Sequence, residues 1–485
     1  MHWVRGPVRL RQKGMRLSPA LLLALAAGAL GVVASPARGR EVHVHILVVG
    51  GTPAGIAAAV AAARSGHSVA LVEARPFLGG VLTGAMLSSF DLSRGPDGRD
   101  TIGGIFHEVY RELDLAFDPR AARMRLLELV RREPAIDLRL GSRVRAVLVE
   151  AGRIRGAVLD DGTTIRARVV IDATDDGDVA AAAGARYTIG RESAGVDRLT
   201  QAATLMFRLR DVRWSEVVAY LTRSEKPRRA GGVYGSLAWG YHRIVSRWRS
   251  PDPERIAAYD LNLSRLPDGS VWVNALQVFR VDGTDRTSRL DGYRRAKRVV
   301  PAFVAFLRAQ APGFARATLT EVAPELYIRE TRHVVGLYTL TARDVIRQRH
   351  FWDRVAAGAY PLDLHPYFPG WTNPYRTRRF YFTVPLRSLV VRDVDGLFIC
   401  SRAFSATYQA AGAARVVPVT MALGQAAGIA ASVSVEAAVS PRELVRRHDL
   451  VALVQWRLQA AGAHISHRAL VASAPGHLVR PAPRP

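Results

Sequence analysis

HILVVGGTPAG at His45–Gly55 decides the fold of this chain, together with the stretch IAAAVAAARSGHSVALVEA that follows it directly. The order is an apolar strand, a tight glycine turn, a helix of small residues and a second strand that ends at Glu73. This order is typical of a dinucleotide-binding βαβ unit, in which the helix N-terminus presents free N–H groups to a pyrophosphate. Gly50 lets the chain turn sharply out of the strand, and Gly55 lets the helix lie close to the sheet.

An acidic residue follows the turn at the distance that this motif requires. Glu73 lies about 20 residues after Gly50, where a carboxylate accepts hydrogen bonds from the ribose of an adenosine. The motif departs from G-x-G-x-x-G at its middle position, where Thr52 replaces glycine and holds the backbone slightly further from the phosphates. The cofactor contacts predicted in this unit are Gly50, Gly51, Thr52, Pro53, Ala54, Gly55, Glu73 and Ala74.

The composition indicates a large α/β protein and argues against sequence-specific nucleic-acid binding. The chain has 485 residues, of which 49% are hydrophobic, so it can bury a sizeable core in two or three structural units. Its formal charge is +26, but Lys13, Lys226 and Lys297 are the only lysines, and arginine is spread along the whole chain. Because no long basic tract alternates with aromatic residues, the charge reflects composition and not a nucleic-acid site.

The N-terminus carries the pattern of a secretory signal. An apolar run at Pro19–Val33 follows several basic residues and precedes Ser35-Pro36-Ala37, which predicts a signal peptide over residues 1–37 with cleavage near Ala37. The alternative is an uncleaved anchor, because the apolar run approaches the length that spans a bilayer. Both interpretations predict an exported, periplasmic or envelope-associated protein, and the second adds membrane association through the N-terminus.

Later segments add a second junction between a strand and a turn. The loop at Leu78–Val81 has two glycines and can approach the middle of a bound dinucleotide closely. Alternating residues over Leu138–Glu150, Arg153–Leu159 and Thr164–Arg168 predict a small β-meander, which leads into a buried strand ending at Asp172. The further cofactor contacts predicted here are Gly79, Gly80, Val144, Ala173, Thr174, Asp175 and Gly177.

Tryptophan and tyrosine become frequent after residue 190, and no further glycine-turn βα unit occurs there. We expect an inserted α+β domain over 191–385, with a strand at Ser270–Phe279 and a helix at Gly292–Ala309. The chain then returns to the first domain through the strand Val394–Cys400 and the helix Val416–Ser432, which has Pro418 in its first turn. The predicted units are therefore 1–37, 44–190, 191–385, 386–436, and a C-terminal helix and tail over 437–485.

Seven segments in this order resemble the FAD-dependent oxidoreductase family, whose members have a two-segment flavin domain of the glutathione-reductase type. The segments are VVGGTPAGIAAAVAAARSG (48–66), LGGVLTG (78–84), VVIDATDDGDVAAAAGA (169–185), RETR (329–332), YPLDLH (360–365), VPLRSLV (384–390) and LFICSRAFSATYQAAGAARVVPVTMALGQAAG (397–428). The resemblance covers residues 44 to about 462. It implies FAD as the cofactor and a Rossmann-like FAD-binding domain built from discontinuous segments, with an inserted α+β substrate or cap domain.

The resemblance also implies places for individual residues. Asp172, Ala173 and Thr174 would lie beside the pyrophosphate and adenosine of FAD. Arg402 would lie near the flavin ring, as would the helix containing Leu423–Gly428, with Gln425 as a contact. The N-terminus of that helix would favour the negative charge of a reduced flavin.

Four residues are candidates for catalysis, since a flavin enzyme must orient a substrate C–H bond and often remove one proton. His365 lies in a loop rich in aromatic residues, and Tyr408 follows Arg402 after the last strand, where the family-like segment often has histidine. Arg329 and Arg332 are suited to hold a carboxylate through forked hydrogen bonds. The alternatives are a hydrogen-bonded loop histidine for His365 and a structural Arg-Glu cluster for the two arginines.

The expected function is hydride transfer between a small organic substrate and FAD, with an electron acceptor that the sequence does not identify. One alternative is a flavin-dependent reductase of a double bond, similar to fumarate reductase or to prenyl reductases. A second alternative is a flavin-containing binding protein without turnover. Cys400, the sole cysteine, ends a buried strand and is expected to pack, and no spacing of ligands predicts a metal site.

Overall fold

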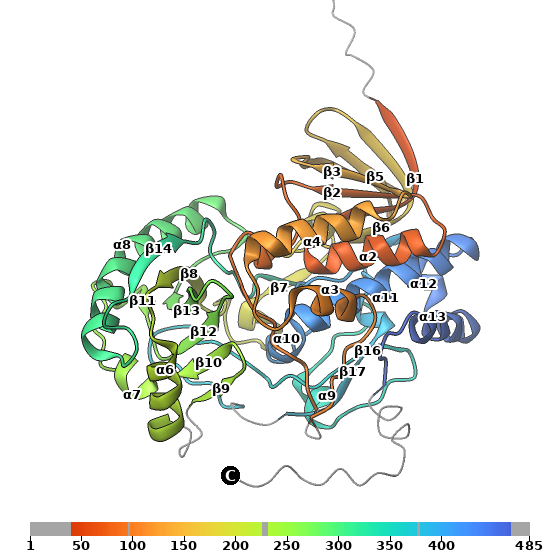
Figure 1. Cartoon of the computed structure of the whole chain (residues 1–485). Helices are drawn as coiled ribbons and strands as arrows, with labels where there is room; N and C mark the ends of the chain where they lie inside the picture. The colour runs from red at the N-terminus through yellow and green to blue at the C-terminus, as the bar shows by residue number, and fades with distance from the viewer. Residues whose placement is uncertain (1–39, 96–97, 226–230, 376–378, 467–485) are drawn as a thin grey trace, which may run out of the picture. The chain divides into compact units, whose positions relative to one another are not determined.

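The N-terminal crossover forms as predicted in the computed structural model, which describes residues 40–95, 98–225, 231–375 and 379–466. β1 (Glu41–Val49), α2 (Pro53–Arg64) and β2 (Val69–Glu73) follow one another (Figure 1). β1 and β2 are parallel neighbours, with Ile46 opposite Val69 and Val49 opposite Val72. The predicted signal segment lies outside the described residues, as does most of the predicted tail.

A mostly parallel sheet is assembled from two distant parts of the chain. Its path runs β3 (Ile136–Leu140), β2, β1, β6 (Thr164–Asp172), β5 (Arg153–Leu159) and β4 (Val144–Glu150). β18 (Leu397–Ile399) is parallel to the C-terminal half of β6, whereas antiparallel β5 pairs with the N-terminal half of the same edge. This confirms the predicted Rossmann-like α/β fold built from discontinuous segments.

The strand predicted over Leu138–Glu150 is in fact two strands. Gly141 has φ +67, so the chain turns there, a conformation that glycine adopts without a steric penalty. Residues before the turn belong to β3, which is parallel to β2, and residues after it form β4 of the meander. The alternation of polar and apolar residues continued through the turn, so the pattern alone did not reveal it.

Two helices of small residues pack against each other beneath this sheet. α11 (Val417–Glu436) is buried along almost its whole length and lies against α2. A Cβ atom at Gly424 would collide with the carbonyl oxygen of Ala54, and one at Gly428 would collide with that of Ala58. Among the described residues α11 is the one helix long and apolar enough to cross a membrane, and it is a fully buried core helix.

A second sheet is entirely antiparallel. Its order is β14 (Thr318–Val322), β8 (Ala203–Arg210), β13 (Val271–Val278), β12 (Leu261–Arg265), β10 (Leu237–Gly240) and β9 (Gly232–Tyr234), with β11 (Ile256–Ala257) beside β13. α8 (Arg286–Gln310) packs on it through Phe303, whose ring meets that of Phe207 edge-on. α8 begins six residues before the predicted helix because the Asp285 side chain caps it, accepting from the N–H groups of Thr287 and Ser288.

The remaining elements connect the two sheets or lie around them. They are α3 (Ile105–Leu113), α4 (Pro119–Arg131), α5 (Asp178–Ala182), β7 (Tyr187–Ile189), α6 (Trp214–Tyr220), α7 (His242–Val245), β15 (Arg332–Val334), α9 (Ala342–Ile346), β16 (Arg354–Gly358), β17 (Phe382–Pro385), α10 (Tyr408–Ala414), α12 (Pro441–Leu444) and α13 (His448–Ala460). From Glu41 onward the chain packs as one unit, so the predicted domain boundaries at 190 and 385 stay predictions.

We expect Gly424→Ala to lower the free energy of unfolding by about 2 to 3 kcal/mol, because its Cβ atom would force α11 away from α2. Chemical denaturation monitored by circular dichroism measures the change. Gly66→Ala is the matched control, since its Cβ atom would meet open space and only the positive φ costs about 1 kcal/mol. Equal losses for the two variants would contradict the close helix contact as a determinant of stability.

Candidate functional site

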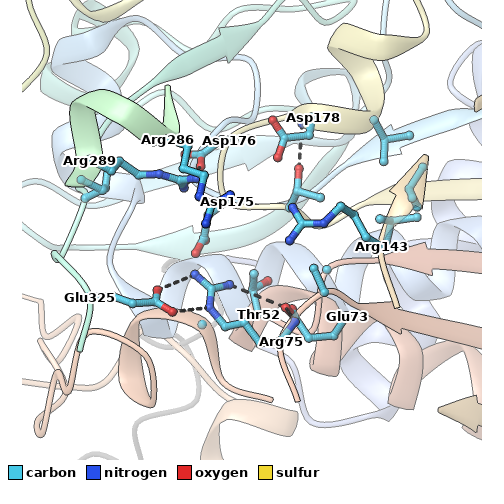
Figure 2. Close-up of a pocket in the computed structure, with 18 of the residues that line it drawn as sticks. Thr52, Glu73, Arg75, Arg143, Asp175, Asp176, Asp178, Arg286, Arg289 and Glu325 are labelled. Carbon is cyan, nitrogen blue, oxygen red and sulfur yellow. Dashed lines mark hydrogen bonds and ion pairs between the residues drawn. The ribbon is translucent and has the colours of Figure 1, made fainter. Parts of the chain in front are cut away.

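A cavity of about 670 Å³ opens where β1, β2 and β6 end. Thr52 lines it after β1, Glu73 lies at the end of β2, and Asp175 follows β6 (Figure 2). Gly50 and Thr174 line it beside these residues. Ligands of parallel α/β sheets bind at the carboxyl ends of the strands, so this is the place expected for a cofactor. We call it the first cavity.

The glycine turn requires its glycines for steric reasons. Gly50 has φ +107, and a Cβ atom there would lie 2.6 Å from the backbone carbon of Ala173. Thr52 has a role that glycine could not fill, because its hydroxyl donates to the Ala173 carbonyl at 2.8 Å and accepts from the Gly55 N–H at 3.2 Å. Thr52 therefore caps α2 and ties the turn to the end of β6, which explains the departure from the three-glycine motif.

Glu73 is held in the cavity wall by backbone donors. Its carboxylate accepts from the N–H groups of Gly51 and Arg75, both at 2.7 Å, and the residue is only 4% exposed. Burial raises the pKa of Glu73 against the opposing effect of the Arg75 charge. Figure 2 shows the Arg75 guanidinium between Glu73 and Glu325, and it binds the Glu325 carboxylate at 2.6 Å. Glu325 follows β14, so the second sheet contributes to the cavity wall.

The acidic loop after β6 forms the opposite wall. Arg402 reaches both of its carboxylates, with Asp176 at 2.6 Å and Asp175 at 3.4 Å. Arg289 of α8 points toward the same loop, 4.0 Å from Asp176 (Figure 2). Asp172, just behind the loop, accepts from Thr174 and Ala180, and burial raises its pKa to about 7. Asp172 thus positions the loop without lining the cavity.

A second cavity of about 930 Å³ lies against the second sheet. A small pocket of about 20 Å³ lies between the two cavities. It shares Asp175 and Arg402 with the first cavity and Tyr327, Arg329 and Arg415 with the second. The first turn of α11 also lines the small pocket, so the two cavities adjoin at a helix N-terminus with free N–H groups and partial positive charge.

An aspartate and a histidine in the second cavity form a charge-linked pair. Asp363 accepts from Arg415 at 2.8 Å and lies 3.3 Å from Nε2 of His365. Burial opposes the charge on Asp363, but His365 and Arg415 outweigh it and hold the pKa of that carboxyl well below its usual range. Burial and the nearby Arg329 charge lower the pKa of His365 to about 4, so His365 is neutral at pH 7 and can accept a proton.

Asp91 also lines the second cavity, although sequence reasoning missed it. The Asp91 side chain faces the open space of the cavity, and the protein around the cavity buries it from bulk solvent. The Tyr360 hydroxyl donates to the Asp91 carboxylate. Burial raises the pKa of Asp91, and it raises that of Tyr360 as well. The only signal in the sequence is its place shortly after the LGGVLTG loop, in a stretch without any motif.

Arg329 is a buried guanidinium without a carboxylate partner in the described part of the chain. It is 2% exposed, donates to the Ala202 carbonyl at 2.8 Å and the Thr204 hydroxyl at 2.6 Å, and stacks over the Tyr327 ring. Burial lowers its pKa to about 10, so it stays charged at neutral pH. A buried positive charge at the junction of the cavities is suited to an anionic group of a ligand.

The structure places most predicted cofactor contacts at or directly behind the cavities. Gly50, Thr52, Glu73, Ala74, Gly80, Val144, Thr174, Asp175 and Arg402 line the first cavity, and Pro53 and Ala54 line the small pocket. The others, Gly51, Gly55, Gly79, Ala173 and Gly177, lie behind these walls. Gly79, for example, donates to the Gly51 carbonyl at 2.7 Å. Arg329 and His365, two of the predicted catalytic residues, both line the second cavity.

Three predicted residues line none of these cavities. Arg332 binds Asp178 at 2.8 Å, Tyr408 packs its ring against Tyr367, and Gln425 accepts from the Ile105 N–H at 3.0 Å. Gln425 turns away because the neighbouring Gly424 faces α2, which rotates the glutamine toward α3. Arg332 pairs with Asp178 and not with Glu330, so the Arg-Glu cluster that was the alternative for it does not form, and the site roles of these three residues stay predictions.

Cys400 is buried, and burial raises its pKa well above the usual value, so a packing role fits it. No group of three or more potential metal ligands occurs in the described ranges.

The family described as FAD dependent oxidoreductase matches residues 45–458. The chain is similar to 6-methylpretetramide 4-monooxygenase of Streptomyces rimosus, with 29% identity over 304 residues that cover 52% of this chain and 67% of that protein. Among solved structures, a geranylgeranyl bacteriochlorophyll reductase-like protein from Thermoplasma acidophilum has a TM-score of 0.43 and 13% identity, covering 89% and 87% of the two chains. A flavin-dependent brominase has a TM-score of 0.45 and 11% identity, covering 83% of each.

The residues of the first cavity fit FAD. Its volume lies within the range of about 300 to 1,000 Å³ typical of small-ligand sites. The turn at Gly50 and the N-terminus of α2 suit a diphosphate, and the Glu73 carboxylate suits a ribose.

We expect Glu73→Ala to weaken FAD binding about tenfold or more, because it removes the ribose acceptor and leaves two backbone N–H groups unpaired. Titration of the deflavinated protein with FAD, followed by flavin fluorescence, measures the dissociation constant. Glu128→Ala is the control, since Glu128 forms only exposed ion pairs on α4. Equal FAD affinity in both variants would remove Glu73 from the site.

Proposed function

The chain belongs to the FAD dependent oxidoreductase family, and we propose that it oxidises a hydroxyl-bearing carbon of an organic substrate held in the second cavity. The observation that carries the proposal is a neutral histidine, His365, beside an ionised aspartate, Asp363, in a cavity that adjoins the FAD site. FAD, when bound, supplies the acceptor for the hydride of that carbon.

His365 takes the hydroxyl proton as the substrate C–H and O–H bonds break and the carbonyl forms. Its lowered pKa keeps it unprotonated at neutral pH, and Asp363 stabilises the imidazolium that results. Arg415 keeps Asp363 ionised and also donates to the Tyr327 hydroxyl at 3.1 Å. Asp363 and Arg415 are therefore positioning residues, while His365 is the proposed base.

Positive charge at the junction of the cavities supports transfer toward the cofactor. Arg329 and the N-terminus of α11 both border the small pocket, and Arg329 has no carboxylate partner among the described residues. Negative charge that arrives there on reduction is stabilised in a site of low dielectric constant. Asp175 and Asp176 pair with Arg402, whereas Asp91 and Asp363 act on Arg329 through their charges without forming an ion pair with it.

The neutral state of His365 favours oxidation over reduction of a double bond, because saturating a double bond requires a proton donor at that place. Monooxygenation is the second candidate function, and the identity to 6-methylpretetramide 4-monooxygenase favours it. The proposal that the protein is exported rests on the apolar stretch Pro19–Val33 alone.

Anaerobic mixing of the purified flavoprotein with candidate alcohols tests the direction of the reaction. Bleaching of flavin absorbance without oxygen, with one carbonyl formed per flavin, supports the proposal. Bleaching only by an external reductant, followed by incorporation of an oxygen atom from O₂ into the substrate, supports monooxygenation and overturns it. If an alkene reoxidises the reduced flavin and no alcohol reduces the oxidised flavin, the protein is a double-bond reductase.

The pH dependence of kcat/KM gives a sharper test of His365. A base must be unprotonated to act, so a pKa of about 4 predicts a flat profile from about pH 5 to 8 and a tenfold fall per pH unit below about pH 4. His365→Asn should lower kcat about 10²- to 10⁴-fold and remove this acid limb. His448→Asn, outside both cavities, is the control, and an inflection near pH 6.5 in the native enzyme would contradict the assignment.

A further inference from the structure

A row of three side chains crosses the second sheet and faces the second cavity. Trp239 of β10 is the cross-strand partner of Asn262 of β12, which in turn is the partner of Asn274 of β13. Directly paired residues project from the same face of a sheet, and all three line the cavity. The row ends at Arg329, whose guanidinium lies 3.4 Å from Oδ1 of Asn274. It therefore runs from the cavity rim to the junction with the FAD site.

Trp239 presents an open aromatic face at the rim. A Cβ atom on Gly232 of the neighbouring β9 would lie 2.6 Å from the indole, so one side of the ring rests across the glycine backbone. The residue is nevertheless 43% exposed. An indole supported from one side and exposed on the other is a stacking platform that a ligand can cover.

The two asparagines offer hydrogen bonds without charge. An amide group donates through its nitrogen and accepts through its oxygen, which matches a hydroxyl group that also donates and accepts. Asn262 is exposed and makes no side-chain hydrogen bond within the described residues. Further along the cavity, the Asp91 carboxylate and the Tyr360 hydroxyl add a hydrogen-bonded pair. These groups suit a ligand with several hydroxyls.

The same groups disfavour two other ligand classes. A long apolar chain would bury the Asn262 amide without a hydrogen-bond partner, at a cost of about 1 to 3 kcal/mol, and it would also remove water from the Asp91 carboxylate. A strongly anionic ligand along the row would find no cation among Trp239, Asn262 and Asn274, and it would face the Asp91 carboxylate. Of the other arginines in the cavity, Arg94 and Arg415 already pair with Asp100 and Asp363, and Arg379 donates to the Arg94 carbonyl. A neutral ligand with hydroxyl groups avoids both costs, because it forms hydrogen bonds with the amides and is not repelled by the Asp91 carboxylate.

We propose that the second cavity binds a neutral polyhydroxylated ring, a sugar or a cyclitol, which stacks on Trp239 and is hydrogen-bonded by Asn262 and Asn274. The C–H face of such a ring covers an aromatic surface, and its equatorial hydroxyls point outward toward the amides. The inference rests on the proposed function, because a ring carbon bearing a hydroxyl is the group to be oxidised. His365 lies in the same cavity to take the proton of that hydroxyl.

Saturation-transfer NMR on the FAD-loaded protein tests binding without turnover. The probes are D-glucose, D-galactose, cellobiose and myo-inositol, with cyclohexanol and farnesol as comparison ligands. Saturation transfer to at least one polyhydroxylated ring is the expected result. No transfer to any of the four, or transfer only to cyclohexanol or farnesol, overturns the inference.

The variants locate the ligand. For the ring that bleaches the flavin anaerobically, Trp239→Ala should raise KM about three- to tenfold with little change in kcat, and Trp239→Phe should restore most of the loss. Trp456→Ala is the matched control, because Trp456 is 64% exposed on α13 and lines neither cavity. An effect of Trp239→Ala no larger than that of Trp456→Ala contradicts the stacking platform.

Failure of this inference differs from failure of the proposed function. If farnesol or cyclohexanol bleaches the flavin and no sugar binds, oxidation of a hydroxyl-bearing carbon stands and the ligand class is wrong. If a sugar binds at Trp239 but no alcohol ever bleaches the flavin, the ligand class stands and the proposed oxidation is wrong.

Discussion

The close approach of the glycine turn to the end of β6 is the constraint on which the rest of the structure depends. Gly50 lies so near the Ala173 backbone that a single added carbon would collide with it. The Thr52 hydroxyl donates across the same gap to the Ala173 carbonyl and accepts from the Gly55 N–H in the first turn of α2. This contact fixes the start of α2 against the sheet. Since α11 packs backbone to backbone on α2, the second segment of the chain takes its position from the same place.

The position of α11 on α2 explains why the two cavities adjoin at the start of α11. The start of α11 borders the small pocket, so its free N–H groups lie at the junction of the first cavity with the second cavity. Arg402, Arg415 and Arg329 approach the junction from three different segments, and only the first two have carboxylate partners among the described residues. Arg329 therefore borders the junction of the cavities without an ion pair, whereas Arg75 in the first cavity pairs with Glu325.

The two faces of the second sheet differ in the residues that they carry. Its buried face forms a core against α8, while the row from Trp239 to Asn274 faces the cavity with polar and aromatic groups. A sheet of this kind can vary its ligand by changing a few residues of one face, because each side chain is fixed by the strand register.

The sequence by itself determined the nucleotide-binding half of this protein. The turn at Gly50, the helix contact at Gly55 and the acid at Glu73 are local requirements of a βαβ unit, so a short stretch of chain specifies them. His365 and Arg329 were also predicted as candidates, from the residue types that flavin chemistry requires. The strand break at Gly141 was missed because the alternating pattern ran through it.

Only the tertiary structure decided how distant segments share one site. Asp91 was missed because its neighbours along the chain give no motif, whereas its neighbour in space is Tyr360. Arg332 on β15, Tyr408 at the start of α10 and Gln425 on α11 have suitable chemistry, but they contact Asp178, Tyr367 and Ile105 and line none of the described cavities. Side-chain direction in a packed core follows contacts between elements, and a linear pattern does not contain those contacts.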